Sequence, residues 1–148
     1  MYRMITLHIT LTTMIMKNNN PIKGLGTDII EIERMHKSIE RHGQHFLNRL
    51  FTQKEQDYCY KFKNPAPHFA GRFAAKEAIV KALGTGFGVH IAWHDIEVLN
   101  DEYGKPIVYL SSEASEKFHS PHLLVSISHC ESYATATAIW CQIAQSVS

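Results

Sequence analysis

The apolar positions of the chain form their clearest pattern between Gly71 and Gly84, in the stretch GRFAAKEAIVKALG. Small and aliphatic residues recur there at helical spacing and share one face: Ala75, Ala78, Ile79, Ala82 and Leu83. This periodicity predicts a helix whose small-residue face packs closely on a sheet. Gly84 is placed to end the helix, because glycine adopts the left-handed conformation at little cost.

The charged residues of this stretch form two rows on the other faces of the predicted helix. Glu77 and Lys81 are four residues apart, as are Arg72 and Lys76, so the members of each pair are neighbours on the helix surface. A carboxylate beside lysines and an arginine suits a site for a metal ion and a phosphate. It also suits a solvated helix face, and the stretch alone leaves both interpretations open.

Patterns in the rest of the chain predict an α+β fold in which a mostly antiparallel sheet packs on this central helix. Strands are expected at 22–30, 93–99, 107–110, 123–129 and 133–140. Helices are expected at 31–42, 45–50, 52–62, from about 68 to Gly84, and from Ser111 to about Phe118. Gly43 is a predicted helix stop, and Thr52 and Glu55 form a capping box. The order is strand, helices, hairpin, helix, hairpin.

The first predicted strand contains residues that suggest a functional site as well as a structural role. Gly24 and Gly26 flank Leu25, which leaves bare backbone that another group can approach closely. Asp28 follows and has two interpretations. It is either the N-cap of the next helix or a metal ligand, and the second role needs another carboxylate brought near by the fold.

Composition narrows the class of protein. The 148 residues fit one domain, and 45% hydrophobic with 20% charged residues is ordinary for a globular chain. The net charge of +1 provides no global field for nucleic acid, so we expect no nucleic-acid partner. Cys59, Cys130 and Cys141 lack metal-like spacing and indicate a reducing, cytoplasmic location. The glycine-dense loop at 84–88 lacks the GKS or GKT of a P-loop.

Residues 1–20 are expected to be an extension of a single domain at 21–148. The first sixteen residues are mildly apolar, but His8 and four threonines interrupt them. They are too short and too polar to span a bilayer, and we expect no membrane partner. The segment is either an over-long start, with Met14 or Met16 as the natural initiator, or a β-rich arm that docks on a neighbouring subunit.

Four motifs occur in order and together resemble a known family: GLGTDIIEIER, FAAKEAIVKALG, DEYGKP and SISH. From about Ile22 to Trp140 the chain resembles the short bacterial holo-acyl-carrier-protein synthase type of the 4′-phosphopantetheinyl transferase superfamily. Each motif alone is a weak signal, whereas four motifs in this order and spacing make a strong one. The resemblance implies the fold of that superfamily and a homotrimer with active sites between subunits, where Asp28 of one chain meets Glu77 or its neighbours in another.

The resemblance first implies a metal site. Asp28 in GTD and Glu77 in KEA match the two protein ligands of Mg²⁺ in the family, with Mn²⁺ as a substitute ion, and hard carboxylates suit either ion. Lys81, one turn beyond Glu77, would face the phosphates. Glu77 and Lys81 are therefore the implied catalytic residues. The general base is either Glu77 or a metal-held water, and the sequence does not decide between them.

The resemblance also implies where coenzyme A, as substrate, and a carrier protein would bind. Residues implied to line the coenzyme A site, its phosphates and its adenine side are Arg72, Lys76, Lys81, Gly104, Lys105, Pro106 and His129. Arg34 and Arg41 match positions that dock the acidic helix of apo-acyl carrier protein. His68, His90 and His94 match no position with a known role.

The implied reaction transfers 4′-phosphopantetheine from coenzyme A to a serine of apo-acyl carrier protein and releases adenosine 3′,5′-bisphosphate. It would serve fatty acid biosynthesis. Two other hypotheses remain. One is a non-catalytic module that binds coenzyme A or a carrier protein. The other is a metal-dependent nucleotide hydrolase built on the same two carboxylates, which would consume coenzyme A without a carrier protein.

Overall fold

The computed structural model describes residues 20–142, so nearly all of the predicted extension lies outside the described residues. The elements in chain order are β1 (Ile22–Glu31), α2 (Ile32–Leu50), α3 (Gln53–Cys59), α4 (Ala66–Leu83), η1 (Trp93–Asp95), β2 (Ile96–Asn100), β3 (Pro106–Leu110), α5 (Ser112–Lys117), β4 (His122–His129) and β5 (Tyr133–Cys141). This order confirms the predicted α+β pattern. Among the described helices, none has both the length and the apolar composition needed to cross a membrane.

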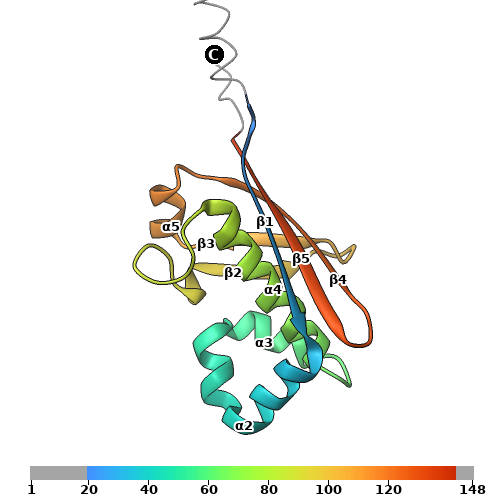
Figure 1. The fold of residues 1–148 in the computed structure, drawn as a ribbon. Coiled ribbons are helices and arrows are strands. Elements are labelled where there is room, and N and C mark those ends of the chain that lie inside the picture. Colours follow the sequence, from blue (N-terminus) through green and yellow to red (C-terminus); the bar gives the residue numbers. More distant parts are fainter. Residues whose placement is uncertain (1–19, 143–148) are drawn as a thin grey trace, which may run out of the picture.

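Helix α4 is the centre of the fold and packs on strands of two sheets (Figure 1). The larger sheet has the order β1-β5-β4, with both pairings antiparallel. The second sheet is the antiparallel hairpin of β2 and β3. Helices α2 and α3 lie across the beginning of α4. The predicted sheet packing on a central helix is therefore confirmed, and α4 is enclosed by neighbours rather than lying on the surface.

Strand β1 approaches α4 more closely than side chains would allow. A Cβ atom built on Gly24 would lie 1.8 Å from the carbonyl oxygen of Ala82, and one built on Gly26 would lie 1.9 Å from that of Ala78. Glycine is thus required at both strand positions of this contact. Ala78 and Ala82 of the predicted small-residue face therefore lie under β1, whereas Ile79 and Leu83, which were predicted to share that face, point to another side.

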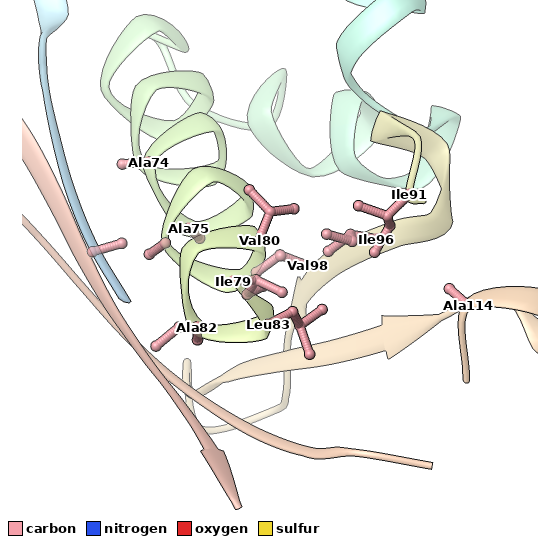
Figure 2. Close-up of a cluster of buried hydrophobic side chains, with 13 residues drawn as sticks. Ala74, Ala75, Ile79, Val80, Ala82, Leu83, Ile91, Ile96, Val98 and Ala114 are labelled. Atoms are coloured by element: carbon pink, nitrogen blue, oxygen red, sulfur yellow. The ribbon is translucent and has the colours of Figure 1, made fainter. Parts of the chain in front are cut away.

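The opposite side of α4 carries larger side chains. Figure 2 shows Ile79, Val80 and Leu83 pointing toward Ile91 and the β2 strand, whereas Ala75 and Ala82 face the long strands. All of these residues belong to one buried cluster. Apolar surface is thus buried on two sides of α4.

Local signals in the sequence set most element boundaries correctly. Gly43 interrupts α2 with φ 58° and ψ −144°, which confirms the predicted stop between two helical pieces. The capping box of Thr52 and Glu55 is formed, and Gly84 ends α4 at φ 74°. Helix α3 ends at Cys59, three residues earlier than predicted.

The predicted strand at 93–99 begins later than its alternation suggested. Residues 93–95 form a 3₁₀ turn, and β2 starts at Ile96. The carboxylate of Asp95 accepts hydrogen bonds from the Ala92 N–H at 2.8 Å and from the Ser111 hydroxyl at 2.7 Å. A side chain that bonds to the nearby backbone favours a turn over a strand ladder.

We expect Gly26→Val to lower the free energy of unfolding by at least about 3 kcal/mol, because the added side chain would overlap the backbone of α4. Urea unfolding followed by circular dichroism measures the change. Lys23→Ala, an exposed change on the same strand, is the control and should stay within about 0.5 kcal/mol of wild type. Equal stability of the two variants would contradict the close contact.

Candidate active site

Two carboxylates predicted from the sequence lie in one pocket of a single chain. Gly24, Gly26 and Asp28 alternate along β1 on the face that contacts α4, so Asp28 takes the next inward position after the two glycines. A pocket of 380 Å³ is lined by both Asp28 and Glu77, and also by Arg34 of α2. The strand–helix contact therefore brings Asp28 to the level of Glu77.

Lys81 is bonded to the same aspartate. Its ammonium group lies 2.9 Å from Oδ1 of Asp28 and donates a second hydrogen bond of 2.9 Å to the carbonyl oxygen of Thr27. The Lys81 side chain is about half exposed, at 49%, whereas that of Asp28 is 17% exposed. The ammonium group is thus held at the edge of the pocket, where solvent or a ligand can reach it.

The pocket places negative charges close together. Burial raises the pKa of the Glu77 carboxyl, the charge of Asp28 raises it further, and Lys81 opposes the shift. Two neighbouring carboxylates suit a divalent cation with open positions for other oxygen ligands. Among the described residues, no group of three or more His, Cys, Asp or Glu side chains is placed to hold a metal ion.

Two expectations about Asp28 need correction. Asp28 lies inside β1 and is not the N-cap of the next helix, because that position is occupied by Glu31. The meeting of Asp28 with Glu77 also requires no second subunit, since both line the same pocket of one chain. Strand β1 continues for three residues past Asp28, so the helix begins only after Glu31 and Asp28 remains within the strand.

A second cluster forms around Arg72 on a different side of α4. Arg72 is only 3% exposed, and its guanidinium carbon lies 3.9 Å from the centre of the Tyr58 ring. Its Nη2 donates a 2.6 Å hydrogen bond to Oδ1 of Asn100. The Nε atom is buried and has no hydrogen-bond partner in the described structure.

Asn100 connects Arg72 to the predicted adenine loop. Its Nδ2 donates a 2.7 Å hydrogen bond to the carbonyl oxygen of Gly104, which precedes Lys105 and Pro106 in the β2–β3 turn. Asp101 shapes the same turn, because its Oδ1 accepts from the N–H groups of Tyr103 and Lys105, each at 2.9 Å. The structure thus joins Arg72 with the Gly104–Lys105–Pro106 loop. Asn100 is not among the site residues predicted from the sequence.

His129 ends β4 beside this cluster. Its ring centre lies 5.9 Å from that of His68, which is one helical turn before Arg72. His68 in turn stacks on Phe62 at 3.6 Å. Arg72, His129 and the hairpin loop are therefore brought to one region, with Asn100, Tyr58 and His68 as neighbours that the sequence interpretation did not assign to a site.

Lys76 lies neither in the Asp28–Glu77 pocket nor in the cluster around Arg72. Its buried position contradicts the expectation that it contacts coenzyme A. The side chain is fully buried, and its ammonium group lies 2.8 Å from Oε2 of Glu55. It also donates to the carbonyl oxygens of Leu50 at 2.8 Å and Trp93 at 3.0 Å. All three ammonium protons are engaged, so no donor is left for a ligand.

Glu55 is the centre of this buried group. Its two oxygens accept hydrogen bonds from the N–H groups of Thr52 and Val98, both at 2.8 Å, in addition to the contact with Lys76. The pair ties α3, α4 and β2 together. Lys76 is therefore neither solvated nor ligand-facing, because α2, α3 and β2 cover this side of the helix, whereas the role predicted for Arg72 stays a prediction.

The docking residues predicted on α2 are exposed. Arg34 and Arg41 are seven residues apart on the exposed side of the helix, whereas Ile32 and Met35 are buried. Arg34 also lines the carboxylate pocket. A partner bound along this face would reach the pocket from the Arg34 end.

Comparison with known proteins identifies the family of this chain. A family profile described as the 4′-phosphopantetheinyl transferase superfamily matches residues 24–138, and the chain belongs to this superfamily. The chain is 61% identical over 117 residues to the holo-[acyl-carrier-protein] synthase of Protochlamydia amoebophila, covering 79% of this chain and 96% of that protein. It is 54% identical over 115 residues to the protein of the same name from Chlamydia pneumoniae, covering 78% and 93%.

Solved structures of proteins with this name share the fold. One from Bacillus anthracis, described as in complex with CoA (3′,5′-ADP), is 38% identical with a TM-score of 0.71, covering 82% of this chain and 98% of that one. One from Helicobacter pylori, in complex with coenzyme A, is 34% identical with a TM-score of 0.72, covering 78% and 98%. The chain thus spans nearly the whole length of these relatives.

We expect Lys76→Met to lower the free energy of unfolding by about 3–5 kcal/mol, because it leaves the Glu55 carboxylate buried without its partner. The double variant with Glu55→Gln should recover part of this loss, since neither side chain is then charged. Chemical unfolding of the four proteins in this cycle measures the coupling. Wild-type stability of Lys76→Met, with weakened coenzyme A binding, would instead restore the ligand role.

We also expect Glu77→Gln to raise the melting temperature at neutral pH without divalent ions. The raised pKa of Glu77 means that its ionisation costs stability as pH rises through the folded-state pKa. Below the ordinary value of 4.5 both folded and unfolded chains carry the proton, so the gain should vanish there. Thermal unfolding across this pH range checks the sign. A gain that does not depend on pH would show that ionisation is not the cause.

Proposed function

We propose that this chain transfers the 4′-phosphopantetheine group of coenzyme A to a serine of apo-acyl carrier protein, in the cytoplasm. The observation that carries the proposal is the pocket shared by Asp28, Glu77 and Arg34, with Lys81 at its edge. Relatives at 61% and 54% identity carry the name holo-[acyl-carrier-protein] synthase, and two structural neighbours are complexes with coenzyme A. Together they support transfer over simple binding.

We propose that Asp28 and Glu77 hold Mg²⁺, for which Mn²⁺ can substitute. The ion would supply charge neutralisation for phosphate oxygens. Its positive charge would also relieve the repulsion that raises the pKa of Glu77. Lys81, which bonds to Asp28 in the structure described here, would then be free to donate to a phosphate oxygen at the pocket edge.

The reaction forms one bond and breaks one. The serine oxygen attacks the phosphorus that carries the pantetheine arm, and the bond from that phosphorus to the bridging oxygen breaks. Adenosine 3′,5′-bisphosphate leaves with the electron pair. The serine proton passes to a base in the same pocket, where Asp28 and Glu77 are the carboxylates that the described chain supplies. Positioning and charge stabilisation are the main contributions of a protein to phosphoryl transfer.

The carrier protein is placed by the exposed face of α2. Arg34 and Arg41 offer two positive charges on one side of this helix, which complements an acidic partner. Because Arg34 lines the pocket, a helix docked there would bring its serine to the carboxylates. Arg34 would therefore belong both to the docking face of α2 and to the lining of the carboxylate pocket.

We further propose that the complete site lies between subunits of a homotrimer. Five residues separate Arg72 from Glu77, which at about 100° per residue places them about 140° apart around α4. The helix is buried between these positions, so one coenzyme A cannot reach both clusters of one chain around it. The exposed face of the larger sheet offers apolar surface for a subunit contact: Leu25 and Ile29 are each 65% exposed and Leu124 is 42% exposed.

The transfer reaction is tested with purified chain, coenzyme A, Mg²⁺ and apo-acyl carrier protein. We expect the carrier to gain the mass of one phosphopantetheine, and Asp28→Asn to lower kcat/KM by about 10²–10³-fold, as loss of one preorganised charged group does. Asp57→Asn, an exposed change on α3, is the control. Coenzyme A consumed without the carrier would indicate a hydrolase, and binding without mass gain under Mg²⁺ or Mn²⁺ would indicate a binding module.

The shared site is tested by mixing inactive variants. Asp28→Asn disables the metal half and Arg72→Gln disables the other half, so each protein alone should be inactive. Unfolding and refolding the two together should restore part of the activity, because some sites then combine two intact halves. Mixed oligomers that stay inactive, or a sedimentation mass of one chain, would contradict the proposal.

A further inference from the structure

The buried Lys76–Glu55 pair is bonded to the backbone of two neighbouring elements. A buried ion pair adds little net stability, since apolar side chains of similar volume often stabilise a core equally well. Its bonds are directional, however, and the Lys76 ammonium group donates to the carbonyl oxygens of Leu50 at 2.8 Å and Trp93 at 3.0 Å. Each of these two carbonyls belongs to an element that supports the Asp28–Glu77 pocket.

The contact with Leu50 fixes the second helical piece of α2, residues 44–50. Leu50 ends the helix, so its carbonyl has no partner within the helix, and the helix dipole favours a cation there. Gly43, at φ 58°, breaks the helix before this piece, so its direction does not follow from the first piece. Phe46, one turn before Leu50, lines the carboxylate pocket. Lys76 therefore holds the helical piece that presents Phe46 to the pocket.

The contact with Trp93 supports a second aromatic residue of the same pocket. The Trp93 ring stacks on the Phe73 ring, with centres 5.2 Å apart and planes 22° apart, and on the Phe87 ring at 3.7 Å. Phe73 lines the pocket together with Phe46. These two residues form the aromatic wall of the pocket, and Lys76 bonds to the backbone that supports each of them.

We propose that Lys76 is a positioning residue for the transfer reaction, because it fixes the aromatic wall relative to the Glu77 carboxylate. This step rests on the proposed function. Lys76 directly precedes Glu77 on α4, so one helix backbone carries both the proposed metal ligand and the group that holds the wall. Glu55 keeps the ammonium group in place through the 2.8 Å contact between them.

The role concerns the carrier protein more than coenzyme A. Arg34 and Phe46 come from the two pieces of α2, so the end of this helix must be held for both to line one pocket. A carrier docked on α2 would be placed against the carboxylates only as accurately as α2 itself. Misplacement of a reacting group by about 1 Å can lower the rate about a hundredfold. The metal ligands Asp28 and Glu77 are joined by the contact of β1 with α4, in which Lys76 has no part.

The test compares wild type with Glu55→Gln/Lys76→Met, in which neither side chain is charged and both carbonyls lose their donor. Transfer to apo-acyl carrier protein is measured with Mg²⁺ and saturating coenzyme A, at a temperature where circular dichroism shows both proteins folded. We expect kcat/KM for the carrier to fall by about 10- to 100-fold, with the affinity for coenzyme A by calorimetry changed less than about twofold. Lost stability alone would lower kcat with the folded fraction and leave KM for the carrier unchanged.

Val80→Ala is the matched control. It removes buried methyl groups one turn after Lys76 on α4, from a side chain that is 1% exposed and points toward Ile91 (Figure 2). The change lowers stability through a cavity but releases neither carbonyl. It should keep the wild-type KM for the carrier and, at equal folded fraction, the wild-type kcat.

The fluorescence of Trp93 gives an independent readout of the wall. Trp93 and Trp140 are the two tryptophans of the chain, so Trp140→Phe, introduced into every protein compared, leaves Trp93 as the signal. We expect Glu55→Gln/Lys76→Met to make Trp93 more accessible to quenching by acrylamide, because the backbone behind its stack is released. Val80→Ala should leave the quenching unchanged.

Lys76→Gln is the second variant if the double variant folds poorly. Its two N–H bonds cannot supply three acceptors, so kcat/KM for the carrier should again fall. An unchanged kcat/KM for the carrier in either folded variant overturns the role of Lys76, as does an equal loss in Val80→Ala. An equal loss of affinity for coenzyme A also overturns it, since Lys76 would then support the donor site. Wild type that modifies no carrier overturns the proposed function instead, so the two failures are distinguishable.

Discussion

The close contact between β1 and α4 is the constraint on which the rest of the structure depends. Gly24 and Gly26 allow the strand backbone to lie directly on the backbone of Ala78 and Ala82. Because alternate residues of a strand share one face, the next inward residue is Asp28, and it arrives beside Glu77 and Lys81. The geometry of the site is thus a consequence of packing two backbones together, and rigid elements supply its side chains rather than loops.

The two sides of α4 carry opposite electrostatic requirements. The Asp28–Glu77 pocket brings two carboxylates together, and a divalent cation would offset the burial and the charge of Asp28 that raise the pKa of Glu77. The Arg72 cluster has excess positive charge that a phosphate would offset. The buried Lys76–Glu55 pair separates them and is already satisfied by hydrogen bonds. A substrate with phosphates and a bound cation would match both sides, and the proposed contact between subunits would present both sides to it.

Much of this arrangement could be predicted from the sequence. The glycine stop at Gly84, the capping box at Thr52 and the hairpin turn after Asn100 are local signals, and local chemistry decides them. The four motifs further identified Asp28, Glu77 and Lys81 as a group, which the structure brings together. The burial of Lys76 could not be predicted, because four-residue spacing from Arg72 looks the same on a solvated face. Its partner Glu55 lies on another helix and had a sufficient local role as a capping residue. The unassigned neighbours Asn100, Tyr58 and His68 join the Arg72 cluster only through tertiary contacts.

The central claim is that Asp28 and Glu77 of one chain hold a divalent ion together. A crystal soaked in Mn²⁺ and measured at the manganese absorption edge tests this directly. We expect one anomalous peak between the two carboxylates, with oxygen ligands at about 2.0–2.2 Å as hard cations of this size require. A peak bound by only one of them, a peak whose carboxylate ligands come from two chains, or no peak in this pocket would contradict it.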